Sequence, residues 1–83
     1  MSPSKNPALM NAFAAVLKAR RSALGISQEE LARRSGVNRS FVARIEIAQN
    51  QPTLSVLFRL SHGLNVAPEE LIRQARLKLE GQT

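Results

Sequence analysis

The sequence predicts an all-α protein, a compact bundle of five helices in a single domain of residues 8–83, preceded by a flexible arm of residues 1–7. Three observations lead to this prediction. Apolar side chains recur every three, four or seven residues through most of the chain, which is the period of a helix with one buried face. Residues that favour helix starts precede several of these segments, and glycines follow others. The first seven residues are polar and include two prolines, which is typical of a loose terminus.

The first helix is expected from about Ala8 to Leu24, where Gly25 stops it. Its predicted buried stripe comprises Met10, Phe13, Val16, Leu17 and Leu24. Lys18 and Arg20 lie in its last turns. Cations there favour the negative end of the helix dipole, and they are equally suited to contact a phosphate.

The second helix is expected to begin at Gln28, because Ser27 and Glu30 have the spacing of a capping box. In that arrangement the Ser27 hydroxyl accepts the backbone N–H of Glu30, and the Glu30 carboxylate reaches back to the N–H of Ser27. Leu31 lies on its apolar side. Gly36 suits the left-handed conformation that ends a helix, so this helix has only about two turns.

The third helix is expected to start at Arg39, capped by the side chain of Asn38. Val42 and Ile45 are spaced for burial, and the outer face then carries Arg39, Ser40, Ala43 and Arg44. Too few residues join the second and third helices for an antiparallel pair. They must cross steeply, which is the helix-turn-helix geometry that presents the second helix of the pair to a groove of DNA.

The fourth helix is expected after a polar loop that ends at Pro52, with Thr53 as its cap. Its predicted core stripe is Leu54, Leu57, Leu60 and Leu64. Gly63 or Asn65 ends it.

The fifth helix is expected from Pro68 to about Leu79. Its apolar stripe, Leu71, Ile72, Ala75 and Leu79, is longer than a small core requires. The stripe therefore predicts a dimer interface, although all four side chains can instead be buried within one monomer.

The positive charge is concentrated around the predicted helix-turn-helix. The net charge is +6, and the segment from Lys18 to Arg44 contains seven basic residues against two acidic ones. Such a surface suits a polyanion, although charge alone does not separate nucleic-acid binding from a merely solvated basic face.

The amino-acid composition argues against an enzyme, a metal or cofactor protein and a membrane protein. The chain has no cysteine, aspartate or tyrosine and one histidine, so the usual sets of nucleophile, base and orienting group cannot be assembled, and we expect no enzyme, cofactor or metal site. No apolar run approaches the roughly 18 residues of a membrane span, so the protein is expected to be soluble and cytoplasmic.

Two segments, LGISQEELARRSGVNRSFVARIE and QPTLSVLFRLSHGLNVAPEEL, carry a resemblance to a known family. Over about Phe13 to Leu71 the chain resembles the phage repressor and Cro type (XRE-like) helix-turn-helix regulators. The resemblance implies a lambda repressor-like DNA-binding domain that binds a two-fold double-stranded DNA operator as a homodimer. It implies a transcriptional repressor or activator, with two alternatives: a protein similar to the small controller proteins of restriction–modification systems, or a phage or chromosomal repressor.

Positions that match the family pattern are expected to contact DNA. Gln28 matches a glutamine that grips a phosphate, and three positions match base readers: Arg39, Ser40 and Arg44. Because arginine commonly reads guanine through two hydrogen bonds, at least one G·C pair per half-site is predicted where Arg39 or Arg44 reaches. Either arginine can instead contact a phosphate. Further contacts to the DNA backbone are expected from Ser27, Asn38, Phe41, Gln49 and Asn50. Phe41 is also expected to pack partly against the core; alternatively its ring contacts the methyl group of a thymine.

Arg21 and Glu46 match a recurrent ion pair that ties the third helix to the first. One departure follows that glutamate, because many relatives have arginine or asparagine and then glycine where this chain has Ile47 and Ala48. The third helix is expected to end near Glu46 or Ile47. Because of this departure it can instead run further, or Ala48 can adopt an ordinary turn, and the following loop carries no positive charge.

The rival interpretation is a protein-interaction module such as an antitoxin, whose partner is a toxin. RNA polymerase is another conceivable protein partner. The fold permits this, since a fold does not fix a function.

Overall fold

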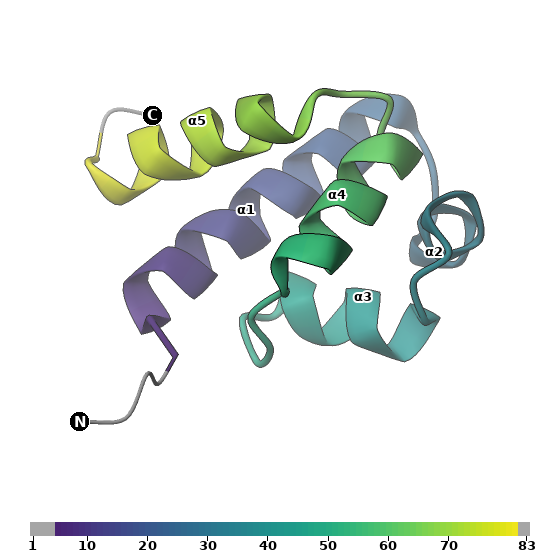
Figure 1. The fold of residues 1–83 in the computed structure, drawn as a ribbon, viewed down its shortest axis with the longest axis horizontal. Coiled ribbons are helices and arrows are strands. Elements are labelled where there is room, and N and C mark those ends of the chain that lie inside the picture. Colours follow the sequence, from purple (N-terminus) through teal and green to yellow (C-terminus); the bar gives the residue numbers. More distant parts are fainter. Residues whose placement is uncertain (1–4, 82–83) are drawn as a thin grey trace.

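The structure is a computed structural model that describes residues 5–81, and those residues form five helices. The helices are α1 (Pro7–Leu24), α2 (Gln28–Ser35), α3 (Arg39–Glu46), α4 (Leu54–Gly63) and α5 (Pro68–Leu79). The predicted all-α bundle is confirmed. Figure 1 shows α1 crossing the molecule diagonally, α5 along one edge and α3 along the opposite edge. Helix α1 packs against both α5 and α3, while α2 packs against α3 and α4.

All five helices contribute to one aliphatic core. Its most buried large side chains, each at most 1% exposed, are Leu17, Leu31, Val42, Ile45, Leu60 and Leu71. Gly63 lets α4 approach α2 closely, because a Cβ added there would lie 3.0 Å from the Cβ of Ser35. The helix-turn-helix is thus held from behind by α1 and α4.

The predicted helix starts at Ser27, Asn38 and Thr53 are confirmed, since each side chain accepts a backbone N–H of the helix that follows it. Half of the predicted capping box is wrong. The Ser27 hydroxyl does accept the N–H of Glu30, at 3.0 Å, but the Glu30 carboxylate accepts from two arginines instead of the Ser27 amide. A carboxylate gains more from two guanidinium groups than from one neutral N–H.

The described residues of the predicted N-terminal arm are not loose. Residues 1–4 lie outside the described part of the chain, and α1 already begins at Pro7, capped by the side chain of Asn6. Lys5 and Asn6 also bond to the loop between α3 and α4, so the described end of the arm is attached to the domain.

The predicted burial of two leucines is wrong. Leu24 is 45% exposed and Leu54 is 69% exposed. Leu24 is the last residue of α1 and Leu54 is the first of α4. Helical periodicity gives the side of a helix that is apolar, but it does not give the point along the axis at which neighbouring helices stop covering that side.

The apolar stripe of α5 is divided between the core and the surface. Leu71 and Ala75 are buried within the protomer, at 0% and 2% exposure, so neither is available to touch a partner subunit and their predicted place in a dimer interface is wrong. Ile72 and Leu79, at 51% and 45% exposure, remain on the surface. Only these two members of the stripe remain candidates for an interface.

The predicted end of α3 near Glu46 or Ile47 is confirmed, whereas a longer helix and an ordinary turn at Ala48 are both wrong. The helix stops at Glu46, and Ala48 adopts a left-handed conformation with φ of 60°. The backbone N–H groups of Gln49 and Asn50 both donate to the backbone carbonyl of Arg44, so this tight turn satisfies the end of the helix. An alanine therefore occupies a conformation that normally favours glycine.

Replacing Ala48 by glycine is expected to raise the free energy of unfolding by about 0.5 to 1 kcal/mol and the melting temperature by about 3 to 6 °C. The gain comes from removing the contact of Cβ with the backbone, which the greater freedom of glycine in the unfolded chain partly offsets. Thermal denaturation followed by circular dichroism measures it. As a control, Ala19→Gly at an exposed position inside α1 should destabilise by about 1 kcal/mol. A lower melting temperature for Ala48→Gly contradicts the prediction.

Candidate nucleic-acid interface

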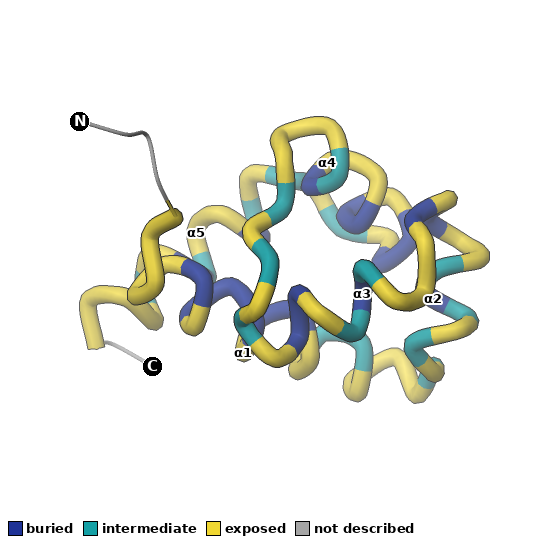
Figure 2. The backbone as a smooth tube through the Cα atoms, turned by 90° about the horizontal axis from the view of Figure 1, so that it is seen from below, coloured by how far each residue is buried: buried dark blue, intermediate teal, exposed yellow. Residues whose placement is uncertain are grey.

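Helix α3 presents a polar face to solvent. Its inner side is fixed by Val42 and Ile45, which are at most 1% exposed. Ser40 and Arg44, half a turn away, are exposed. Figure 2 looks onto this side of the molecule and shows exposed segments of α3 alternating with its buried ones. A short helix with this division can lie along a groove while its other side stays packed.

The position of α3 is fixed by a buried ion pair. The Glu46 carboxylate accepts from Arg21 twice, at 2.6 Å from Nε and 3.0 Å from Nη2, and its side chain is 1% exposed. Arg21 Nη1 also donates to the carbonyl of Ile26 at 2.8 Å. The predicted Arg21–Glu46 pair is therefore present, and it joins the end of α1, the turn before α2 and the end of α3.

Gln28 belongs to the same cluster. Its Nε2 donates to Glu46 Oε1 at 3.0 Å, which leaves the second N–H of the amide for another acceptor. Burial raises the pKa of Glu46. The hydrogen bonds from Arg21 and Gln28, with the nearby charge of Lys18, lower it by more than burial raises it, so the net pKa is below the ordinary value. Glu46 is thus a carboxylate at neutral pH, and it holds Gln28 in position.

A polar hollow opens beside this cluster, at the N-terminus of α2. It is lined by Arg21, Ser27, Gln28, Glu29 and Arg39. Within residues 5–81, no protein group accepts the backbone N–H of Gln28 or Glu29. Free N–H groups at a helix start, with two guanidinium groups beside them, favour an anionic oxygen.

The loop after α3 is hydrogen-bonded to the residues that precede α1. Lys5 Nζ donates to the carbonyl of Gln49 at 3.3 Å, and the N–H of Asn6 donates to Gln51 Oε1 at 3.0 Å. With its amide oriented to satisfy both neighbours, Asn50 accepts from Arg44 Nε at 3.1 Å. The terminal nitrogens of Arg44 then remain available on the outer face of α3.

Most arginines away from α3 form ion pairs with carboxylates, whereas most cations near α3 do not. Arg33 and Arg34 pair with Glu30. Three further arginines pair with carboxylates of α5 or the residue after it: Arg20 and Arg73 with Glu70, and Arg76 with Glu80. The guanidinium partners lower the pKa of Glu30 to about 2 and that of Glu70 to about 2.

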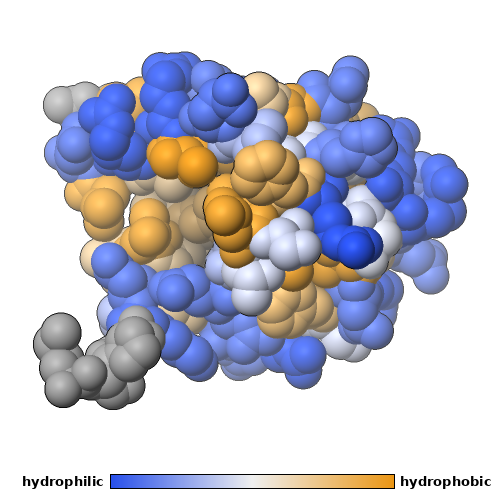
Figure 3. Space-filling view, in the orientation of Figure 1, coloured by the Kyte–Doolittle hydropathy of each residue, from blue (hydrophilic) through white to orange (hydrophobic). Residues whose placement is uncertain are grey.

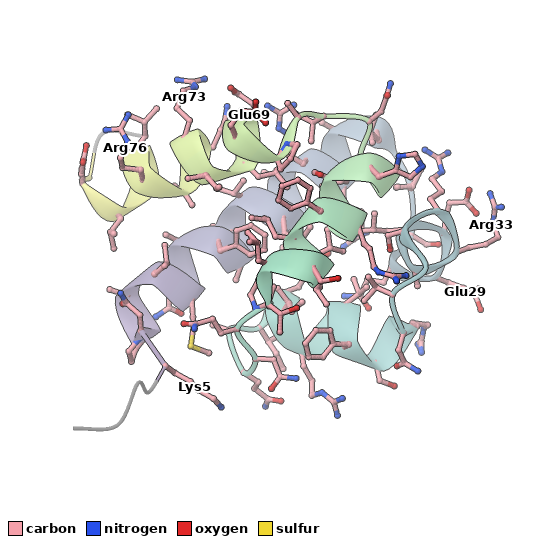
Figure 4. All side chains as sticks on the ribbon, viewed as in Figure 1. Lys5, Glu29, Arg33, Glu69, Arg73 and Arg76 are labelled. Atoms are coloured by element: carbon pink, nitrogen blue, oxygen red, sulfur yellow. The ribbon has the colours of Figure 1, made fainter. Side chains whose placement is uncertain are left out.

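Five cations near α3 or the turn before it have no carboxylate partner among the described residues: Lys5, Lys18, Arg39, Arg44 and Arg59, whose Nη1 lies close to Gly36. In Figure 4, Arg73 and Arg76 on α5 point away from α3, whereas Lys5 points to the same side as α3. Sequence reasoning missed Lys5, because its proximity to the loop depends on how α1 packs against α3.

The other predicted contacts are placed as follows. Phe41 is half-buried against the core, Asn38 uses its side chain to accept the N–H of Ser40, and Gln49 is exposed on the loop. Ile47, which was not predicted as a contact, is 60% exposed directly after α3. Its spacing of seven residues from Ser40 was a signal available in the sequence.

A second surface lies between α1, α4 and α5. It is an apolar groove of about 320 Å³ whose lining includes the exposed side chains of Leu9, Leu54, Ile72 and Leu79. Figure 3 shows hydrophobic side chains gathered on this face and hydrophilic ones around them. Separately, no helix within residues 5–81 is long and apolar enough to cross a membrane.

Comparison with known proteins gives consistent matches. Residues 17–71 match a family model described as helix-turn-helix. The chain is 36% identical over 55 residues to the control protein C.SmaI of Serratia marcescens, a match that covers 66% of each chain, just under two thirds.

Solved structures match over a larger share of the chain. The restriction-modification controller protein C.AhdI from Aeromonas hydrophila matches with a TM-score of 0.73 and 37% identity, over 75% of this chain and 94% of that one. The clp gene regulator ClgR from Corynebacterium glutamicum matches with a TM-score of 0.82 over 89% of this chain and 79% of that one. Its 23% identity supports the fold alone.

Proposed function

This chain belongs to the helix-turn-helix family of the XRE type, whose members are DNA-binding transcriptional regulators rather than enzymes, and we propose that it reads a two-fold operator in the major groove as a homodimer. The observation that carries the proposal is the outward face of α3. It presents Ser40 and Arg44 on a helix that is held rigidly by the buried Glu46 and that lies amid uncompensated positive charge. Because its proposed ligand is operator DNA, we expect the protein to act in the cytoplasm.

The two arginines of α3 have different surroundings. Arg44 lies on the side of the helix opposite the buried Val42 and is braced through Nε by Asn50, so its terminal nitrogens suit the O6 and N7 acceptors of guanine. Arg39 lies beside the polar hollow with Gln28. This favours Arg44 as the base reader and Arg39 as a residue that reaches the backbone.

Phosphate contacts would fix the register of α3 in the groove. The second N–H of the Gln28 amide and the free backbone N–H groups at the start of α2 are the donors on one side. Gln49 and Asn50 on the loop, with the nearby ammonium of Lys5, are the donors on the other. The lysine supplies a positive charge that the loop itself lacks.

A second copy of this chain is the proposed occupant of the apolar groove. A two-fold interface requires a self-complementary surface, and the exposed leucines and isoleucine that line the groove are apolar side chains that two copies would bury against one another. One helix-turn-helix unit makes a small interface with DNA, so pairing two units about 34 Å apart doubles it.

Control of a restriction–modification system is the narrower role that we propose. C.SmaI is named a control protein, and C.AhdI is named a restriction-modification controller, at 36% and 37% identity respectively. The operator selected by this chain should then occur upstream of its own gene and a neighbouring nuclease gene.

Selection of bound sequences from a random DNA pool, at two salt concentrations, tests the proposal. The expected result is a two-fold motif with a steep fall of affinity as salt rises, because phosphate contacts release counterions. No enrichment at low salt would refute it.

On the selected operator, Arg44→Ala is expected to relax the preference at one G·C pair by about 1 to 3 kcal/mol, whereas Gln28→Ala should weaken all sequences about equally. The reason is that a base contact carries sequence information and a phosphate contact does not. Titration against single-base operator variants measures both effects. Arg73→Ala on α5, which points away from α3, is the control and should leave the preferences unchanged. An Arg44→Ala variant with intact preference at every base pair contradicts the assignment. In the same titration, Arg39→Ala distinguishes a base contact of Arg39 from a contact with the DNA backbone.

A further inference from the structure

We infer that Ile47 is a specificity-determining residue that contacts the 5-methyl group of one thymine in each half-site. The inference rests on the proposed function, since it assigns a further reader to the same DNA-binding face. It arises from an apolar side chain in an unusual place. Ile47 is 60% exposed directly beside the polar face of α3, and it lines neither the apolar groove nor the polar hollow.

The register of α3 directs Ile47 toward the same side as the proposed base readers. At about 100° per residue, Ile47 lies about 20° from Ser40 and about 60° from Arg44 around the helix axis. Ile47 is the cap residue after α3, with φ of −106° and ψ of 16°. Its φ differs from the helical value by about 40°, so its side chain lies within about 60° of Ser40 around the helix axis. Along the axis Ile47 lies about 4.5 Å beyond Arg44, somewhat more than one base-pair step of about 3.4 Å.

The turn after Ile47 fixes its position. The N–H of Ala48 donates to the carbonyl of Ile45 at 3.0 Å, and the N–H of Gln49 donates to that of Arg44 at 2.8 Å. Ala48 follows in a left-handed conformation, and Ile47 remains 60% exposed. A β-branched side chain has few rotamers, so little conformational entropy is lost when it packs against a ligand.

The chemistry of Ile47 limits what it can read. It has no donor or acceptor in its side chain, so it cannot bond a phosphate or the polar edge of a base. The one apolar group that distinguishes a base in the major groove is the methyl of thymine. An isoleucine on this face therefore selects thymine at the base-pair step adjacent to the one that Arg44 reads.

Replacing thymine by uracil removes only that methyl group, which gives a direct test. In the selected operator, each thymine of one half-site is replaced by deoxyuridine in turn, and the affinity of the wild-type chain is measured. One position should lose about fourfold, the effect of one buried methyl group. The variant Ile47→Ala should lose affinity for the thymine operator and show no further loss with uracil at that position. Ile47→Val, which keeps a branched apolar side chain, should retain most of the discrimination.

Controls separate this contact from general effects. Leu24→Ala removes an exposed leucine at the end of α1 and should not change DNA affinity. Because Ile47 is exposed, Ile47→Ala should melt within a degree or two of the wild type. If the wild type is indifferent to uracil at every thymine, or if Ile47→Ala discriminates as the wild type does, the inference is wrong although the proposed function stands. Absence of any selected motif would instead remove the proposed function itself.

Discussion

Replacing Arg21 by alanine should lower the melting temperature by about 10 to 20 °C and weaken DNA binding at the same time. The expected loss is about 3 kcal/mol, because the variant leaves the 1%-exposed Glu46 side chain without its charged partner. The carbonyl of Ile26 loses its donor as well. DNA affinity falls because the same carboxylate positions Gln28 and the end of α3. Thermal denaturation and operator titration below the melting transition measure the two effects.

An exposed arginine provides the matched control. Arg34 pairs with Glu30 at 2.9 Å, but its side chain is 40% exposed. Arg34→Ala should therefore cost at most about 1 kcal/mol, as surface ion pairs do. Equal melting temperatures for Arg21→Ala and the wild type would show that the buried pair contributes nothing to stability.

The contribution of Glu46 to the pH dependence of stability should have opposite signs in the wild type and in Arg21→Ala. In the wild type the pKa of Glu46 is below its ordinary value, so the carboxylate contributes stability that is present above the unfolded pKa and is lost as the pH falls through the folded one. In Arg21→Ala, burial is no longer opposed by the guanidinium group, and it should raise the pKa. The stability difference between the two proteins should therefore be largest near pH 7. It should narrow as the pH falls from the raised pKa of Glu46 in the variant to its lowered pKa in the wild type.

Replacing Ile72 by glutamate should convert the proposed dimer into monomers at micromolar concentration and lower operator affinity by at least about 100-fold. Ile72 is 51% exposed and lines the apolar groove, so a two-fold contact would bury two new charges without partners. Affinity falls because the second half-site no longer binds at the high effective concentration that a dimer provides. Sedimentation equilibrium and operator titration on the full chain are the measurements.

Leu24→Glu is the matched control for this change. It makes the same polarity and charge change at an exposed leucine that lies outside the groove, so both the oligomeric state and the affinity should remain nearly unchanged. A wild-type chain that sediments as a monomer at high concentration refutes the dimer. A variant that stays dimeric would place the interface elsewhere.

Local chemistry explains which parts of the protein could be predicted from the sequence. Ser27, Asn38 and Thr53 start helices because their side chains reach a backbone N–H two or three residues ahead, and Gly36 ends one because it lacks a Cβ. These interactions span a single turn, so their spacing is visible in the sequence. The Arg21–Glu46 pair was found through the resemblance, because nothing local joins residues 25 positions apart.

The errors arise where the outcome depends on how helices pack. Leu24 and Leu54 have the right period for burial but lie beyond the cover of neighbouring helices, and Leu71 differs from Ile72 only in the side of α5 that meets α1 and α4. The sequence by itself determined the five helices, the charge around α3 and the polar identity of its outer face. Only the tertiary structure decided which apolar residues stay exposed, that Lys5 approaches the loop, and that the left-handed Ala48 leaves Ile47 uncovered. The physical reason is that periodicity and capping are properties of one turn of chain, whereas burial is a property of the surfaces that several helices share.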